Sequence, residues 1–246
     1  MNRLGRVSVS ILLLFGAIAC SAAESGSDEK KGSSGVADQS STSITDGDST
    51  SSPNSIAKTD MTLGAEDAPL TLIEYASLTC PACANFHENV YPTIKEKFID
   101  TGQVRFVFRE FPTAPVDFSL IGSVLARCAA EEVGSDGYFL LLKALFKNQR
   151  TWIYGEDPKL ELLKIAGQAG MDEAAFDACL KERQDLVDLI RDNAEAGSEA
   201  FDITGTPTLV LNGEKIKYGS VDELVEQIET AVTAANDADA DDGSNG

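Results

Sequence analysis

Two cysteines separated by two residues carry the most specific chemistry in this sequence. Cys80 and Cys83 enclose Pro81 and Ala82, directly after an apolar, strand-like run at residues 70–76. Proline suits the first position of a helix, because its missing N–H would have no partner there. Cys80 is therefore predicted at the N-terminal cap of a helix, facing the free N–H groups and the positive end of the helix dipole. A thiolate is stabilised in that position, so we expect the pKa of Cys80 to lie below that of a free thiol.

Cys83 is expected to be the sheltered partner of Cys80. It follows one helical turn later on the same side, close enough to form a disulfide with it. An exposed, low-pKa attacking thiol and a sheltered resolving thiol suit thiol–disulfide exchange, a reaction that needs neither a metal nor a cofactor. The same spacing also occurs in half of a zinc knuckle and in structural disulfides. The strand before the motif and the helix after it favour redox chemistry.

Two further titratable residues flank the cysteine pair. Glu74 interrupts the apolar strand and is either a solvent-facing acid or a buried one. If it is buried near Cys83, it could take the proton of that thiol during exchange. His87 is the only histidine and lies one turn beyond Cys83. Because it points away from the helix start, we expect a packed or surface-facing side chain and no role beside a nucleophile of the Cys-His type.

The beginning of the chain predicts export. Residues 1–20 combine two arginines with an apolar run that is too short to span a bilayer as a helix. The run ends at Cys20 in a pattern that resembles a bacterial lipobox, so lipidation of Cys20 would attach the protein to the membrane. Cleavage before or shortly after this point would instead release a soluble exported protein. Both outcomes place the domain in the periplasm or cell envelope, where disulfides persist.

Composition divides the rest of the chain into three parts. Residues 21–55 are rich in Ser and Asp and are expected to be a disordered linker, because they cannot bury enough apolar surface. Residues 56–235 form the folded domain, and residues 236–246 are expected to be a disordered acidic tail. The net charge of −20 argues against nucleic acid as a partner, since phosphate binding needs a basic surface.

Hydrophobic periodicity gives the order of elements inside the domain. The pattern predicts a helical insertion at about residues 116–201, between a strand–helix–strand unit and a final hairpin and helix. The other predicted elements are an edge strand at 56–61, a strand at 70–76, a helix from Pro81 with a kink near Pro92, a strand at 103–111, a hairpin at 206–218 turning at Asn212-Gly213, and a helix from Ser220 to about 234.

Cys128 and Cys179 each fall on an apolar helical face of the insertion. Buried free cysteines are common, but in an oxidising compartment a disulfide between the two is the better interpretation. Such a bond would contribute roughly 4 kcal/mol in the loop-entropy account. Trp152 is expected in a loop, as a packing anchor.

The domain as a whole resembles the DsbA-like branch of the thioredoxin superfamily. The resemblance rests on the cysteine pair at a helix start, the helical insertion, and Gly205 to Thr208 before the last hairpin. It implies an α/β, thioredoxin-like fold with an inserted all-helical subdomain. It also implies that Pro207 is cis and lies beside the cysteines, that the backbone of Thr206 pairs with an extended substrate peptide, and that Glu74 is a buried proton relay. Ala82 departs from the family's usual histidine, which leaves the oxidising power open.

We therefore interpret the sequence as an exported thiol–disulfide oxidoreductase that introduces disulfides into folding proteins through Cys80 and Cys83. Its expected substrates are exported proteins with cysteines, and the resemblance implies a membrane redox partner of the DsbB type. One alternative is a disulfide reductase or isomerase of the same fold. A second alternative, of another class, is a zinc-binding structural module that uses the four cysteines of the domain.

Overall fold

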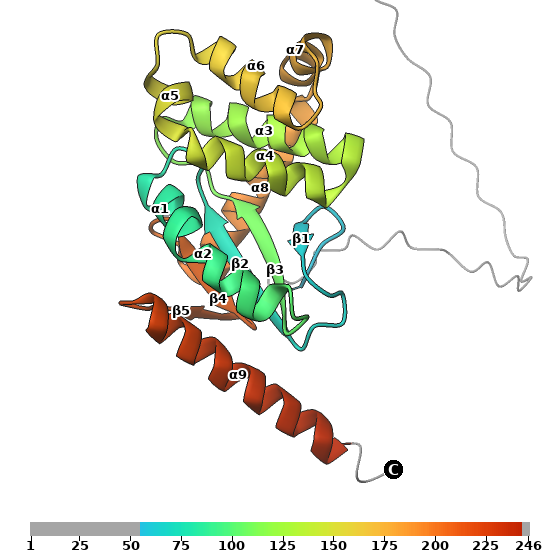
Figure 1. Cartoon of the computed structure of the whole chain (residues 1–246), viewed down its shortest axis with the longest axis vertical. Helices are drawn as coiled ribbons and strands as arrows, with labels where there is room; N and C mark the ends of the chain where they lie inside the picture. The colour runs from blue at the N-terminus through green and yellow to red at the C-terminus, as the bar shows by residue number, and fades with distance from the viewer. Residues whose placement is uncertain (1–54, 243–246) are drawn as a thin grey trace, which may run out of the picture. The chain divides into compact units, whose positions relative to one another are not determined.

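The computed structural model describes residues 55–242, and a five-stranded sheet lies at its centre (Figure 1). The strand order is β1-β3-β2-β4-β5, with β2 and β3 parallel and the other neighbours antiparallel. The strands are β1 (Met61–Leu63), β2 (Leu70–Ala76), β3 (Val104–Glu110), β4 (Thr208–Leu211) and β5 (Glu214–Ile216). Strands β2 and β3 are almost entirely buried, as expected of paired parallel strands, and the buried residues include Glu74, Arg109 and Glu110.

The remaining elements are helices, and most of them form the insertion between β3 and β4. Figure 1 shows α3 to α7 gathered beyond one end of the sheet, with α8 returning toward it. The helical elements are α1 (Pro81–Asn89), α2 (Tyr91–Ile94), the π-helical turn η1 (Lys95–Ile99), α3 (Val116–Val133), α4 (Ser135–Lys147), α5 (Gln149–Tyr154), α6 (Pro158–Gln168), α7 (Glu173–Glu182), α8 (Gln184–Phe201) and α9 (Val221–Asp242). The α/β fold with an inserted helical subdomain is thus confirmed.

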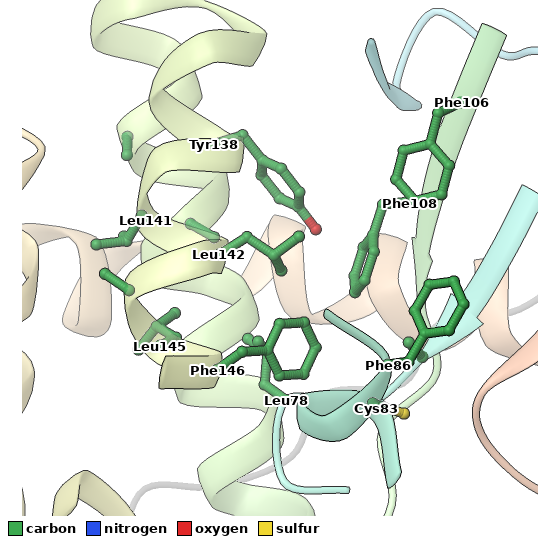
Figure 2. Close-up of a cluster of buried hydrophobic side chains, with 14 of the residues drawn as sticks. Leu78, Cys83, Phe86, Phe106, Phe108, Tyr138, Leu141, Leu142, Leu145 and Phe146 are labelled. Carbon is green, nitrogen blue, oxygen red and sulfur yellow. The ribbon is translucent and has the colours of Figure 1, made fainter. Parts of the chain in front are cut away.

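The insertion shares one hydrophobic core with the sheet. Figure 2 shows Tyr138 and Phe146 of α4 facing Phe108 of β3, with Phe86 of α1 at the side of this group. All four side chains are buried. The face of α1 that carries Cys83 is therefore packed between the sheet and the insertion, so packing of the insertion contributes to the position of the cysteine pair.

Two buried charge networks tie other segments to β3. Glu110 accepts hydrogen bonds from the guanidinium of Arg127 on α3, at 2.6 and 2.7 Å, and from the hydroxyl of Tyr138 at 2.8 Å. Arg109 pairs with Asp60 at 2.7 Å and so holds the segment before β1. Because each charge has a partner, these polar groups tolerate burial.

Several elements differ from the sequence predictions. The edge strand is Met61–Leu63 and not residues 56–61, because only these three residues pair with β3. Trp152 lies in the short helix α5 and not in a loop; six residues are too few to show a helical period. Its side chain is fully buried, as expected of a packing anchor. Helix α9 reaches Asp242, past the expected start of the tail at residue 236, and its alanines favour this continuation.

Three sequence predictions concern the beginning of the chain. The predicted signal, Cys20 and nearly all of the predicted linker lie outside the described residues. Among residues 55–242, no helix has both the length and the apolar character that crossing a membrane requires.

Candidate active site

The start of α1 positions the first cysteine. Cys80 is the N-cap residue, with extended backbone angles (φ −80°, ψ 120°), and Pro81 opens the helix. The N–H of Cys80 donates to the carbonyl of Ser77 at 3.1 Å, and its own carbonyl accepts from the N–H of Ala84 at 3.2 Å. The Cys80 thiol is half-buried at the helix start, where a negative charge is favoured.

The two thiols have opposite environments. Both are free, so the structure shows the reduced dithiol form. A hydrogen bond from Cys83 is the main cause that lowers the pKa of Cys80 to about 5, against the opposing effect of burial. The Thr206 side chain and the backbone N–H groups of Ala82 and Cys83 also lower it. Cys83 is fully buried, and burial, the hydrogen bond to Cys80 and the charge of Glu74 all raise its pKa. This is the asymmetry of an attacking and a resolving thiol.

The loop before β4 brings Thr206 and Pro207 against Cys80. The Thr206–Pro207 peptide bond is cis, and the Thr206 carbonyl oxygen lies 3.2 Å from Cys80 Sγ. A groove of about 730 Å³ runs along this loop, lined also by Lys215 and Tyr218 from the hairpin that follows. A second groove, of about 820 Å³, lies on the other side of Pro81, against α4 and α5. Thr206, which contacts Cys80, thus lines one open groove, and Pro81, which follows Cys80, lines another.

Hydroxyl groups hold the loop that leads into the cysteine pair. Ser77 Oγ accepts the backbone N–H of Thr113 at 3.1 Å and that of Thr79 at 3.3 Å, and lies 2.9 Å from Ser119 Oγ on α3. Thr79 Oγ1 donates to the Thr113 carbonyl at 2.9 Å. These residues connect β2, the loop after β3 and the insertion directly ahead of Cys80.

Gln149 is a supporting residue that the sequence analysis missed. Its Nε2 group donates to the carbonyls of Leu78 and Cys80, at 2.9 and 3.0 Å, from the first residue of α5. The side chain is buried. No local pattern marks it, because its partners lie about seventy positions earlier in the chain. A glutamine inside the predicted helical insertion was the only available signal.

We expect Gln149→Leu to lower the free energy of unfolding by about 1–3 kcal/mol, because the buried Leu78 carbonyl loses its hydrogen-bond donor. Chemical denaturation of the reduced protein measures the change. Gln184→Leu is the matched control, since Gln184 is exposed and bonds only to the exposed Asp188. Equal losses in the two variants would contradict the supporting role of Gln149.

Glu74 and His87 form a buried pair behind the cysteines. Glu74 is fully buried on β2, so the solvent-facing alternative is wrong. Its Oε2 lies 2.9 Å from Nε2 of His87 on α1. Of the packed and surface-facing positions expected for His87, the structure shows the packed one, and the ring also contacts the carboxylate, which the sequence analysis did not foresee. His87 follows Cys83 by four residues and so lies on the same face of α1.

Cys128 and Cys179 lie apart from this site, in a disulfide that joins α3 to α7 with a Cα–Cα distance of 6.3 Å. They are consequently not free to bind a metal together with Cys80 and Cys83. Among residues 55–242, no cluster of three or more metal-ligating side chains occurs. Cys20 lies outside the described residues.

Comparison with known proteins agrees with this geometry. The sequence profile described as Thioredoxin matches residues 56–230. The chain belongs to the thioredoxin family. The crystal structure of alpha-DsbA1 of Wolbachia pipientis superposes on this member with a TM-score of 0.66 at 31% identity, covering 73% of this chain and 94% of that one. The branch is therefore DsbA-like, as the sequence resemblance implied.

Two proteins with similar sequences are named for disulfide chemistry. Disulfide bond formation protein D of Bacillus subtilis is 30% identical over 182 residues, which are 68% of this chain and 74% of that protein. A protein of Rickettsia bellii, named as a protein-disulfide oxidoreductase, is 30% identical over 177 residues. That match covers 72% of this thioredoxin-family chain and 66% of the relative's length.

Proposed function

We propose that this protein is an exported thiol–disulfide oxidoreductase that donates its Cys80–Cys83 disulfide to folding proteins. The observation that carries the proposal is the asymmetry of the two thiols. The pKa of Cys80 is lowered to about 5, whereas Cys83 is buried and its pKa is raised. A pair whose reduced form contains a stabilised thiolate is a good electron acceptor. The names of the relatives support the same reaction class.

The reaction proceeds in two exchanges. A substrate thiolate attacks Cys80 Sγ, the Cys80–Cys83 bond breaks, and its electron pair leaves on Cys83, which takes up a proton. A second substrate thiolate then attacks the substrate sulfur of the mixed disulfide, and Cys80 leaves as a thiolate. The substrate gains a disulfide and the enzyme is left as a dithiol. The groove beside Thr206 and Pro207 is the proposed site of the extended substrate segment, because Thr206, which lines it, contacts the attacked sulfur.

Substrates, partner and location are part of this proposal. We infer that the substrates are exported proteins with cysteines, and that a membrane partner of the DsbB type re-oxidises the dithiol. The predicted signal of residues 1–20 supports a place in the periplasm or cell envelope. Lipidation of Cys20 would hold the domain at the membrane, and mass spectrometry of the exported protein distinguishes the lipidated from the released form.

The reduction potential of the cysteine pair tests the direction of electron flow. We expect equilibration with glutathione redox buffers to give a value nearer to about −120 mV, as in DsbA, than to about −270 mV, as in thioredoxin. A value at the thioredoxin end would overturn the proposal in favour of a reductase or isomerase. Cys80→Ser gives the blank, and the disulfide in the helical insertion remains present in both samples.

A further inference from the structure

Glu74 has one hydrogen-bond partner among residues 55–242. Its Oε2 bonds to His87 Nε2 at 2.9 Å, while its Oε1, which is also buried, has no partner in this part of the chain. A buried polar group without a hydrogen-bond partner is costly. The contact with His87 satisfies one oxygen of this carboxyl group and leaves the other open.

Aromatic rings fix the orientation of the His87 imidazole. The ring stacks on Phe146 of α4, with a centroid distance of 4.3 Å and an interplanar angle of 18°. Tyr91 lies 4.9 Å away and Phe108 approaches edge-on at 5.9 Å. Because these three aromatic side chains restrict rotation of the imidazole ring, its Nε2 atom stays directed at Glu74. The insertion thereby contributes to the geometry around a carboxylate of the sheet.

The same face of α1 presents Cys83. His87 follows Cys83 by four residues, which places the two side chains one above the other on the helix. A carboxylate that bonds to His87 therefore lies against the helix face that carries the Cys83 thiol. The electrostatic effect of Glu74 on Cys83, which raises the pKa of this thiol, agrees with that placement.

We propose that His87 is a positioning residue for proton transfer between Cys83 and Glu74. This inference rests on the proposed function and adds a residue to its machinery. The imidazole donates Nε2–H to Oε2 of Glu74, fixes the orientation of the carboxylate, and leaves Oε1 free to exchange a proton with Cys83.

The step concerned is the resolution of a mixed disulfide on Cys80 when the dithiol is re-oxidised. Cys83 gives its proton to Oε1 of Glu74, and its sulfur electron pair forms the bond to Cys80 Sγ. The bond between Cys80 and the partner sulfur breaks, and its electrons leave on the partner as a thiolate. The partner is an external disulfide, so sulfur, protons and electrons balance.

Other titratable groups lie near the pair, and Glu88, Lys147 and Lys95 line the same cavities as His87. Tyr91 of α2 and Tyr218 after β5 both have pKa values raised by burial and, next, by the charge of Glu74, so they are neutral donors at physiological pH. Lys143 of α4 lines a cavity of about 230 Å³ together with His87. Lys143→Met serves as a control for charge near the imidazole that does not involve the bond to Glu74.

The test separates the two thiols kinetically. Reduced protein is mixed with the aromatic disulfide dithiobis(nitrobenzoate) in a stopped-flow instrument. The first thiol released reports attack by Cys80, and the second reports resolution by Cys83. At pH 7 we expect His87→Leu to slow the second phase about 10-fold or more, because the proton acceptor is no longer held in position. The rate of the first phase should stay within about 2-fold of that of the unmodified protein. His87→Gln, which retains an N–H donor of similar reach, should restore most of the second rate.

Controls decide between positioning and general damage. Glu74→Gln should slow the second phase as well, and adding His87→Leu to it should cause little further loss, because both changes remove the same acceptor. Lys143→Met should leave both phases unchanged. The proposal is overturned if His87→Leu leaves resolution unchanged, if it slows both phases equally, or if His87→Gln is as slow as His87→Leu. Failure of the proposed function is distinguishable, because it would appear in the reduction potential of the unmodified protein, whereas the test of His87 compares resolution rates between variants.

Discussion

Between pH 5 and pH 8, the free energy of unfolding of the reduced protein is expected to rise by about 2 kcal/mol more than that of Cys80→Ser. The cause is the pKa of Cys80, which is about 5 in the folded chain and about 9 in an ordinary thiol. Each pH unit between these values would add about 1.4 kcal/mol if the thiol were fully shielded from solvent. We expect roughly half of the total, because Cys80 is only half-buried and solvent screens its interactions.

The sign follows from proton binding. Below about pH 5 the folded and unfolded chains both hold the Cys80 proton, and the thiolate contributes nothing. As the pH rises from 5 toward 9, the folded chain has released the proton and the unfolded chain still binds it, so stability increases. The gain is complete above the unfolded pKa and is lost as the pH falls through the folded pKa.

Denaturant titrations of both proteins under reducing conditions, at several pH values, measure this difference. The difference between the proteins removes the contributions of groups that they share. Cys83→Ala adds a further check: it deletes the main hydrogen bond that lowers the pKa of Cys80, so the rise should begin at a higher pH. Parallel pH profiles for the reduced protein and Cys80→Ser would contradict the assignment of Cys80 as the stabilised thiolate.

Arg127→Met is expected to destabilise the domain by about 3–5 kcal/mol, the usual cost of removing one partner from a buried ion pair. Glu110 would be left without its buried ionic partner in a site where only 1% of it is exposed, and the Tyr138 hydroxyl would still donate to it. The variant also loses the bond from Arg127 to the Thr59 carbonyl, which holds the segment before β1. Thermal and denaturant unfolding measure the loss.

Two further variants show whether the uncompensated charge is responsible. Combining Arg127→Met with Glu110→Gln removes both charges and should restore part of the lost stability. Lys164→Met breaks the exposed pair with Glu161 and should change stability by less than about 1 kcal/mol. If the double variant were as unstable as Arg127→Met alone, lost packing and not the buried charge would explain the effect.

Local patterns were sufficient for the parts of the fold that neighbouring residues decide. Pro81 predicts a helix start, and it places Cys80 at the cap with an extended backbone. Asn212 and Gly213 predict a tight hairpin, and both have positive φ values, of 47° and 88°. These features follow from steric preferences within a few residues, so the sequence carries them directly.

The proximity of Thr206 and Cys80, by contrast, was expected from the family resemblance alone. The two residues are 126 positions apart, and their contact depends on how β4 pairs with β2. A hydrophobic pattern spans only a few neighbouring residues, so it cannot predict a contact between residues so far apart in the sequence. The identity of the nucleophile was therefore a local prediction, whereas its environment required knowledge of a fold.

By itself, the sequence determined the reactive cysteine pair, the strand and helix that present it, and the helical character of the insertion. The tertiary structure alone decided that Glu74 is buried against His87 and that Gln149 holds the backbone of Cys80. These contacts depend on where the insertion packs on the sheet, through side chains such as Phe146 that touch both. Their partners are far apart in the sequence, so only the three-dimensional packing of the core brings them within hydrogen-bond distance.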